Sequence, residues 1–128
     1  MIEERMKFLI EVGNKLQFAK VYYREDWDVY YFDILGKQFG LMTKDVTEDG
    51  IITLKGHPET NEELRETYED IVPGYYANKK HWNSIKLNST AISDSEIEKM
   101  IQTSYQLVWD KLPKKVRQEA EKNSKLKS

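Results

Sequence analysis

Three short segments rich in aromatic and β-branched residues constrain the fold of this chain more than any other feature. They are residues 27–34 (WDVYYFDI), 38–43 (QFGLMT) and 51–55 (IITLK). Aromatic and β-branched residues are typical of strands, and Tyr30, Phe32 and Ile34 share one face of the first segment. Two turn sequences separate these segments, Leu35-Gly36-Lys37 and Thr47-Glu48-Asp49-Gly50. Glycine favours turns because it accepts a positive φ, and aspartate favours them because it bonds its own backbone. The pattern predicts an antiparallel meander of three strands.

Helical patterns flank this meander on both sides. Residues 1–16 carry apolar side chains at helical spacing, with charged side chains on the opposite face. Pro58 and the acidic residues after it suit the first turn of a second helix, which Pro73-Gly74 ends. Ser93-Asp94-Ser95-Glu96 has the form of a capping box. It begins a third helix whose apolar stripe extends to Leu112.

Two further segments complete the predicted organisation. Residues 82–87 (WNSIKL) have the composition of a fourth strand, and residues 18–26 fit either a short strand or an ordered loop. A chain of 128 residues with 39% hydrophobic residues suits one domain with a single core. We therefore expect one α+β domain over residues 1–122, in which helices flank an antiparallel sheet. We expect a basic, frayed tail over residues 123–128.

The composition excludes several classes of protein. With no cysteine, the chain has no disulfide framework, thiolate metal site or cysteine nucleophile. No apolar run approaches the roughly 18 residues that a membrane span needs. Glu3 and Glu4 lie where a secretory signal would be basic. We expect a cytoplasmic monomer that makes no contact with membranes.

The familiar catalytic and metal-binding motifs do not occur in the sequence. The two histidines, His57 and His81, lack the spacing of a zinc site. There is no Gly-x-Ser-x-Gly elbow and no glycine-rich phosphate loop. A lone His81 beside a tryptophan suits a packed structural residue better than a general base. The sequence predicts no enzyme activity, no bound metal and no cofactor.

Charge is segregated along the chain, although the net charge is only −2. Residues 57–71 are strongly acidic, whereas residues 72–90 contain three lysines and no acidic residue. Residues 111–128 contain seven basic residues against two glutamates. A polyanion responds to the local field rather than to the total charge, so the small net charge does not exclude a nucleic-acid partner. We expect any such binding to be modest, sensitive to salt and confined to one face.

The basic segment 72–90 has the composition of a nucleic-acid surface. Its lysines are interleaved with aromatic and amide side chains. Lysines neutralise phosphates, aromatic rings stack on bases and amides form hydrogen bonds. The alternative is structural, with Trp82 anchoring the loop to the core and the lysines only keeping the protein soluble. The lysine-rich C-terminus has the same two interpretations, and it extends the phosphate-facing surface if it lies near this segment.

One run of residues resembles the signature of a known family. The signature of the MmcQ/YjbR family of small bacterial proteins is similar to the run Pro73-Gly74-Tyr75-Tyr76-Ala77-Asn78-Lys79-Lys80-His81-Trp82-Asn83-Ser84-Ile85. Matching residues occur in family order over residues 27–115. They are Gly36-Lys37-Gln38-Phe39-Gly40-Leu41, Leu54-Lys55 with Pro58-Glu59, Leu64-Arg65-Glu66-Thr67-Tyr68, Ser104-Tyr105-Gln106-Leu107-Val108 and Leu112-Pro113-Lys114-Lys115.

The resemblance implies an α+β fold similar to the frataxin/CyaY type and a DNA-binding function with a double-wing arrangement. It establishes no catalytic residue. The predicted contact residues are Asn78, Lys79, Lys80, His81, Trp82, Asn83 and Lys86. The lysines are expected to contact phosphates, the histidine and the second asparagine to form hydrogen bonds, and the tryptophan to stack on a base or to hold the loop. The alternative is a non-catalytic protein- or ligand-interaction module in which this loop is structural.

Overall fold

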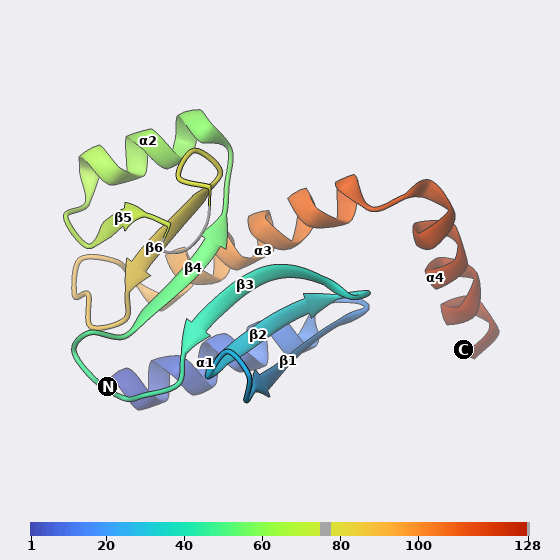
Figure 1. The fold of residues 1–128 in the computed structure, drawn as a ribbon, viewed down its shortest axis with the longest axis horizontal. Helices are drawn as coiled ribbons and strands as arrows, with labels where there is room; N and C mark the ends of the chain where they lie inside the picture. The colour runs from blue at the N-terminus through green and yellow to red at the C-terminus, as the bar shows by residue number, and fades with distance from the viewer. Residues whose placement is uncertain (75–77, 128) are drawn as a thin grey trace.

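Helices and strands make up most of the computed structural model, which describes residues 1–74 and 78–127, with side chains as far as residue 124 (Figure 1). In chain order the described elements are α1 (Ile2–Lys15), β1 (Ala19–Arg24), β2 (Val29–Ile34), β3 (Lys37–Thr43), β4 (Ile51–Lys55), α2 (Pro58–Thr67), β5 (Ile71–Pro73), β6 (Trp82–Lys86), α3 (Asp94–Lys111) and α4 (Lys114–Lys127). The predicted α+β class is confirmed. The finer likeness to the frataxin/CyaY type stays a prediction.

The strands form one antiparallel sheet in the order β1-β2-β3-β4-β6-β5. The predicted meander is confirmed as β2, β3 and β4, and β1 extends it at one edge. At the β2–β3 turn, Leu35 and Gly36 both adopt positive φ, and the Asp33 carboxylate accepts a hydrogen bond from the Gly36 amide over 2.7 Å. Glycine adopts a positive φ without strain and therefore suits the second position of this two-residue turn.

The strand β5 was not predicted from the sequence. It contains only three residues, Ile71–Pro73, and its pairing with β6 makes it a strand. A segment of three residues that includes a proline is too short to show the alternating pattern of a strand. Proline fits here because β5 lies at the edge of the sheet. The second predicted helix is correspondingly shorter than its sequence pattern suggested, because α2 ends at Thr67.

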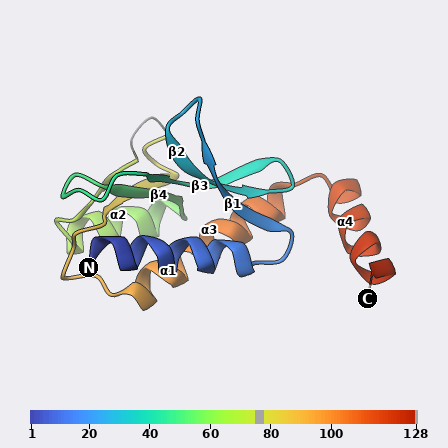
Figure 2. The same cartoon turned by 90° about the horizontal axis from the view of Figure 1, so that it is seen from below.

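The helices α1, α2 and α3 cover one face of the sheet, and Figure 2 shows α1 and α3 lying along it. The core lies between these layers, and cross-strand neighbours Met42, Ile52 and Ile85 contribute to it, each at most 1% exposed. Ser104 of α3 fixes the layers to one another. Its hydroxyl donates to the Phe39 carbonyl over 2.5 Å and accepts from the Lys55 amide over 2.8 Å. This contact sets the position of α3 against the ends of β3 and β4.

The two ends of α3 have clear local causes. The Ser93 hydroxyl accepts a hydrogen bond from the Glu96 amide over 3.1 Å, as the predicted N-cap requires. The Glu96 carboxylate does not complete a capping box, because it accepts instead from the Tyr68 hydroxyl over 3.3 Å. At the other end Leu112 leaves the helical conformation directly before a proline.

The last helix, α4, projects away from the rest of the domain in both views (Figures 1 and 2). It extends to Lys127 and therefore includes residues 123–127, which the sequence had assigned to a frayed tail. Over the part of the chain that the structure describes, none of the helices combines the length and the apolar character needed to cross a bilayer.

Candidate nucleic-acid interface

Most of the predicted contact residues lie in or directly after a tight turn before β6, here called the signature loop (residues 78–81). The Asn78 carboxamide oxygen accepts from the Lys80 amide over 2.9 Å. The Asn78 carbonyl accepts from the His81 and Trp82 amides over 3.2 and 3.0 Å. Asparagine side chains favour such turns because they replace a backbone acceptor. Lys79 and Lys80 stand exposed at the tip, so the loop presents two cations to solvent, as predicted.

Two side chains of α2 hold the signature loop in place. Arg65 donates from Nη1 to the Lys79 carbonyl over 2.8 Å. Asn61, which is 3% exposed, donates from Nδ2 to the Lys80 carbonyl over 3.1 Å and to the Gly56 carbonyl over 3.2 Å. Arginine and asparagine therefore satisfy the loop carbonyls that the turn itself leaves free.

Asn83 belongs to this supporting network rather than to the exposed surface. It is 4% exposed. Its Oδ1 accepts from Arg65 over 3.0 Å, and its Nδ2 donates to the Asn61 carbonyl over 3.2 Å. Both ends of the Asn83 amide therefore bond to protein groups, and its predicted role as a hydrogen-bonding contact to nucleic acid stays a prediction. Sequence reasoning could not detect this, because an asparagine beside lysines has the same composition whether it points outward or inward.

Trp82 lies half-buried at the start of β6, where its backbone is fixed on two sides. Its carbonyl accepts from the Gly74 amide over 2.8 Å. A Cβ at Gly74 would lie 2.6 Å from the Cβ of Trp82, so only glycine permits this approach. Across the sheet Trp82 pairs with Lys55 of β4. His81, also half-buried, bonds through its carbonyl to the Gly56 amide over 2.9 Å.

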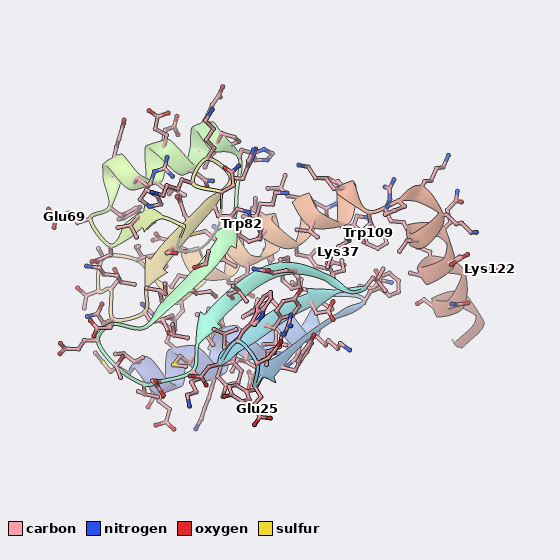
Figure 3. All side chains as sticks on the ribbon, viewed as in Figure 1. Glu25, Lys37, Glu69, Trp82, Trp109 and Lys122 are labelled. Atoms are coloured by element: carbon pink, nitrogen blue, oxygen red, sulfur yellow. The ribbon has the colours of Figure 1, made fainter. Side chains whose placement is uncertain are left out.

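A small hollow beside Trp82, here called the lysine pocket, gathers three lysines from separate elements. Its volume is about 290 Å³, and it is lined by Lys37, Gln38, Lys55, Trp82, Val108, Lys111 and Leu112. The start of β3, the end of β4, the start of β6 and the end of α3 meet there, and Figure 3 labels Lys37 and Trp82. Lys111 belongs to the basic C-terminal segment, which thus reaches the predicted surface.

The lysine pocket brings like positive charges close together. Burial, followed by the neighbouring Lys111, lowers the pKa of Lys55 from its ordinary value of 10.5. No ion pair among the described residues involves Lys37, Lys55 or Lys111. In the sequence, Lys37 and Lys55 stand out only as members of the family pattern. No local signal identifies them as neighbours in space.

Lys86 lies apart from the signature loop, at the other end of β6. It pairs with Ile51 and borders a separate hollow of about 440 Å³, whose lining includes Val29, Leu41 and Val72. The predicted contact residues are therefore not one surface: Lys86 does not join Lys79 and Lys80. Tyr75 and Tyr76, the other aromatic residues of the basic segment, lie outside the described residues.

The described residues offer no site for a metal ion. Among residues 1–74 and 78–127 there is no group of three or more histidine or acidic side chains that could ligate one. His57 occupies the N-cap position of α2 and makes no side-chain cap there; its carbonyl accepts from the Asn61 amide over 2.8 Å.

Comparisons with known proteins agree on the family. The YjbR family model matches residues 16–107. The uncharacterised protein YjbR of Escherichia coli K12 is 32% identical over 92 residues, which cover 72% of this chain and 76% of that protein. The uncharacterised protein YyaQ of Bacillus subtilis is 42% identical over 60 residues, which cover 47% of this chain and 49% of that protein.

Solved structures extend the similarity to nearly the whole fold. A crystal structure of a Deinococcus radiodurans protein with the domain DUF419 superposes with a TM-score of 0.80 at 28% identity, covering 91% of this chain and 87% of that one. A crystal structure of a Pseudomonas syringae protein superposes with a TM-score of 0.66 at 26% identity, covering 79% of this chain and 96% of that one. The sequence match, the sheet order and the supported signature loop lead to one conclusion: this chain belongs to the YjbR family.

Proposed function

We propose that this chain is a non-catalytic DNA-binding protein whose contact surface combines the signature loop with the lysine pocket. One observation carries the proposal: Lys37, Lys55 and Lys111 line one hollow together with Trp82, which follows the exposed Lys80 by two residues in the chain. Lysines without carboxylate partners are suited to neutralise phosphates, and each neutralised phosphate releases condensed counterions.

The support of the loop by α2 favours binding as well as folding. Arg65 and Asn61 hold the backbone carbonyls of Lys79 and Lys80. The two ammonium groups therefore project from a turn whose backbone is already ordered. Less conformational entropy is lost on binding when the contact groups are positioned in advance.

The beginning of α4 extends the same surface. Leu112 lines the lysine pocket, and the exposed Lys114 and Lys115 follow it directly across Pro113. A duplex or a single strand that contacts the pocket can therefore contact further cations at the start of α4. Phosphate contacts of this kind position a protein on DNA without reading its sequence.

A second candidate, a protein- or ligand-interaction module, is favoured by a different observation. A mostly apolar hollow of about 290 Å³ lies between α2 and α3, with Leu64, Tyr68 and Met100 in its lining. On this reading the bonds from Arg65 and Asn61 serve the fold alone. Failure to bind DNA in the experiment below would support this candidate.

Fluorescence anisotropy with labelled duplex and single-stranded DNA tests the proposal. We expect binding at tens of micromolar protein or below in low salt. The double variant Lys79→Glu/Lys80→Glu should weaken binding by at least about tenfold. The matched control is Lys7→Glu/Lys15→Glu, which makes the same change in net charge at two exposed positions of α1.

Salt provides an independent measure of the phosphate contacts. Between about 50 and 200 mM salt the affinity should fall steeply, with a slope of about one per neutralised phosphate on duplex DNA. The proposal is wrong if neither DNA binds at tens of micromolar protein, or if the loop variant and the α1 control behave alike.

A further inference from the structure

We infer that the lysine pocket is a binding site for a terminal phosphate monoester, carried by a nucleotide or by the 5′ end of a nucleic-acid strand. This inference rests on the proposed function for its choice of a nucleotide as the carrier. The inference goes beyond DNA binding because it assigns a terminal phosphate to one small hollow rather than to a charged surface.

The positive charges that line the pocket favour an anion that carries more than one negative charge. Lys37, Lys55 and Lys111 come from β3, β4 and α3, and no carboxylate is among the lining residues. The lowered pKa of Lys55 reflects burial and the charge of Lys111, so without a ligand the charged form of Lys55 is disfavoured. A bound anion offsets part of this effect by pairing with the lysines.

A terminal phosphate fits these charges better than an internal one. A phosphate monoester carries about −1.5 to −2 charges near neutral pH, whereas each phosphate within a strand carries one. Lysines are suited to such a group, because each acts as a compact point charge with three donors. Three ammonium groups around one dianion therefore favour the end of a strand over its interior.

The volume of the pocket and its residues other than lysine indicate what the phosphate is attached to. About 290 Å³ is at the lower end of small-molecule sites, so the hollow admits a phosphate with part of a nucleoside, whereas a duplex can contact only its rim. Trp82, Val108 and Leu112 form its apolar wall, and Gln38 supplies an amide. An indole beside a phosphate site offers a stacking surface that every base can use.

The backbone around the pocket is fixed before any ligand binds. Ser104 joins the Lys55 amide to the Phe39 carbonyl, and thereby holds α3 against β3 and β4. Trp82 is fixed through its bond to Gly74. The strands and the helix that carry the three lysines are therefore held against one another before a ligand binds, which lowers the entropy lost on binding.

Two oligonucleotides that differ only at the 5′ end test the inference. A labelled single strand with a 5′-phosphate should bind at least about tenfold more tightly than the same strand with a 5′-hydroxyl. Lys111→Gln and Lys37→Gln should each reduce this ratio towards one. Lys79→Gln/Lys80→Gln should weaken both strands and leave the ratio unchanged, since these lysines do not line the pocket.

Calorimetry with small molecules distinguishes the two sources of the phosphate. Adenosine 5′-monophosphate should bind the full chain, while adenosine and inorganic phosphate should bind more weakly. If both strands bind equally and adenosine 5′-monophosphate does not bind, the inference fails while DNA binding stands. If neither strand binds but the nucleotide binds and Lys111→Gln abolishes it, the proposed DNA binding fails and the phosphate site stands. Absence of binding by every ligand overturns both.

Discussion

Arg65 of α2 donates a hydrogen bond from Nη1 to the Oδ1 atom of Asn83 in β6, over 3.0 Å. The same nitrogen donates to the Lys79 carbonyl over 2.8 Å. One guanidinium thus connects a helix, a strand and the signature loop. The two residues lie 18 positions apart in the sequence, and both fall within the runs that resemble the family signature.

Arg65→Ala should destabilise the fold and release the loop. Removal of the guanidinium leaves the buried Asn83 oxygen and the Lys79 carbonyl without this donor, at a cost of about 1–3 kcal/mol. Urea unfolding measures the loss, and hydrogen exchange should quicken at the Lys80, His81 and Trp82 amides. Glu66→Ala is the control, because Glu66 lies at an exposed position of the same helix. Equal effects from the two substitutions would contradict the supporting role.

Ser104→Ala should cost about 1–3 kcal/mol although it removes only one oxygen atom. Ser104 is fully buried, and its hydroxyl serves the Phe39 carbonyl and the Lys55 amide together. Thermal or urea unfolding gives the loss. Gln102→Ala, at an exposed position of the same helix, should change stability little. A fully stable Ser104→Ala protein would show that water replaces the hydroxyl.

Ser93→Ala should lower the free energy of unfolding by about 1 kcal/mol, because Ser93 caps the first turn of α3. Ser95→Ala, two residues into the exposed first turn, is the matched control and should be close to neutral. The difference between the two midpoints in urea isolates the cap. No difference would mean that the Glu96 amide finds another acceptor.

Lys55→Met should alter how stability depends on alkaline pH. The folded state lowers the pKa of Lys55, so the unfolded chain binds more protons as pH rises through that lowered pKa. The contribution of Lys55 is therefore fully present above 10.5 and is lost as pH falls through the lowered value. Tyr31 and Tyr105, whose pKa values burial raises, act in the opposite direction and equally in both proteins.

The measurement is the difference in unfolding free energy between the original chain and Lys55→Met. This difference should shift in favour of the original chain as pH rises from neutral towards 10.5. Lys15→Met is the control, since Lys15 is exposed on α1. A difference that is flat with pH for Lys55→Met would indicate that Lys55 is solvated like any surface lysine.

Local patterns were sufficient to predict most of the elements. The aromatic and β-branched residues of β2, β3 and β4 and the Ser93 cap of α3 are signals that lie within a few positions, and the predictions made from them are confirmed. The segment that fitted either a strand or a loop is β1, because β2 offers it a pairing edge. The pairing of β5 with β6 likewise depends on a partner outside the segment, so no local pattern revealed it.

The sequence by itself determined the α+β class, the order of the main elements and the basic character of the signature loop, since these follow from local propensity and composition. Only the tertiary structure decided that Asn83 is buried, that Lys86 stands apart, and that Lys37, Lys55 and Lys111 meet beside Trp82. The reason is physical. Strand register and the packing of α3 bring together side chains that are far apart along the chain, and no local pattern carries that information.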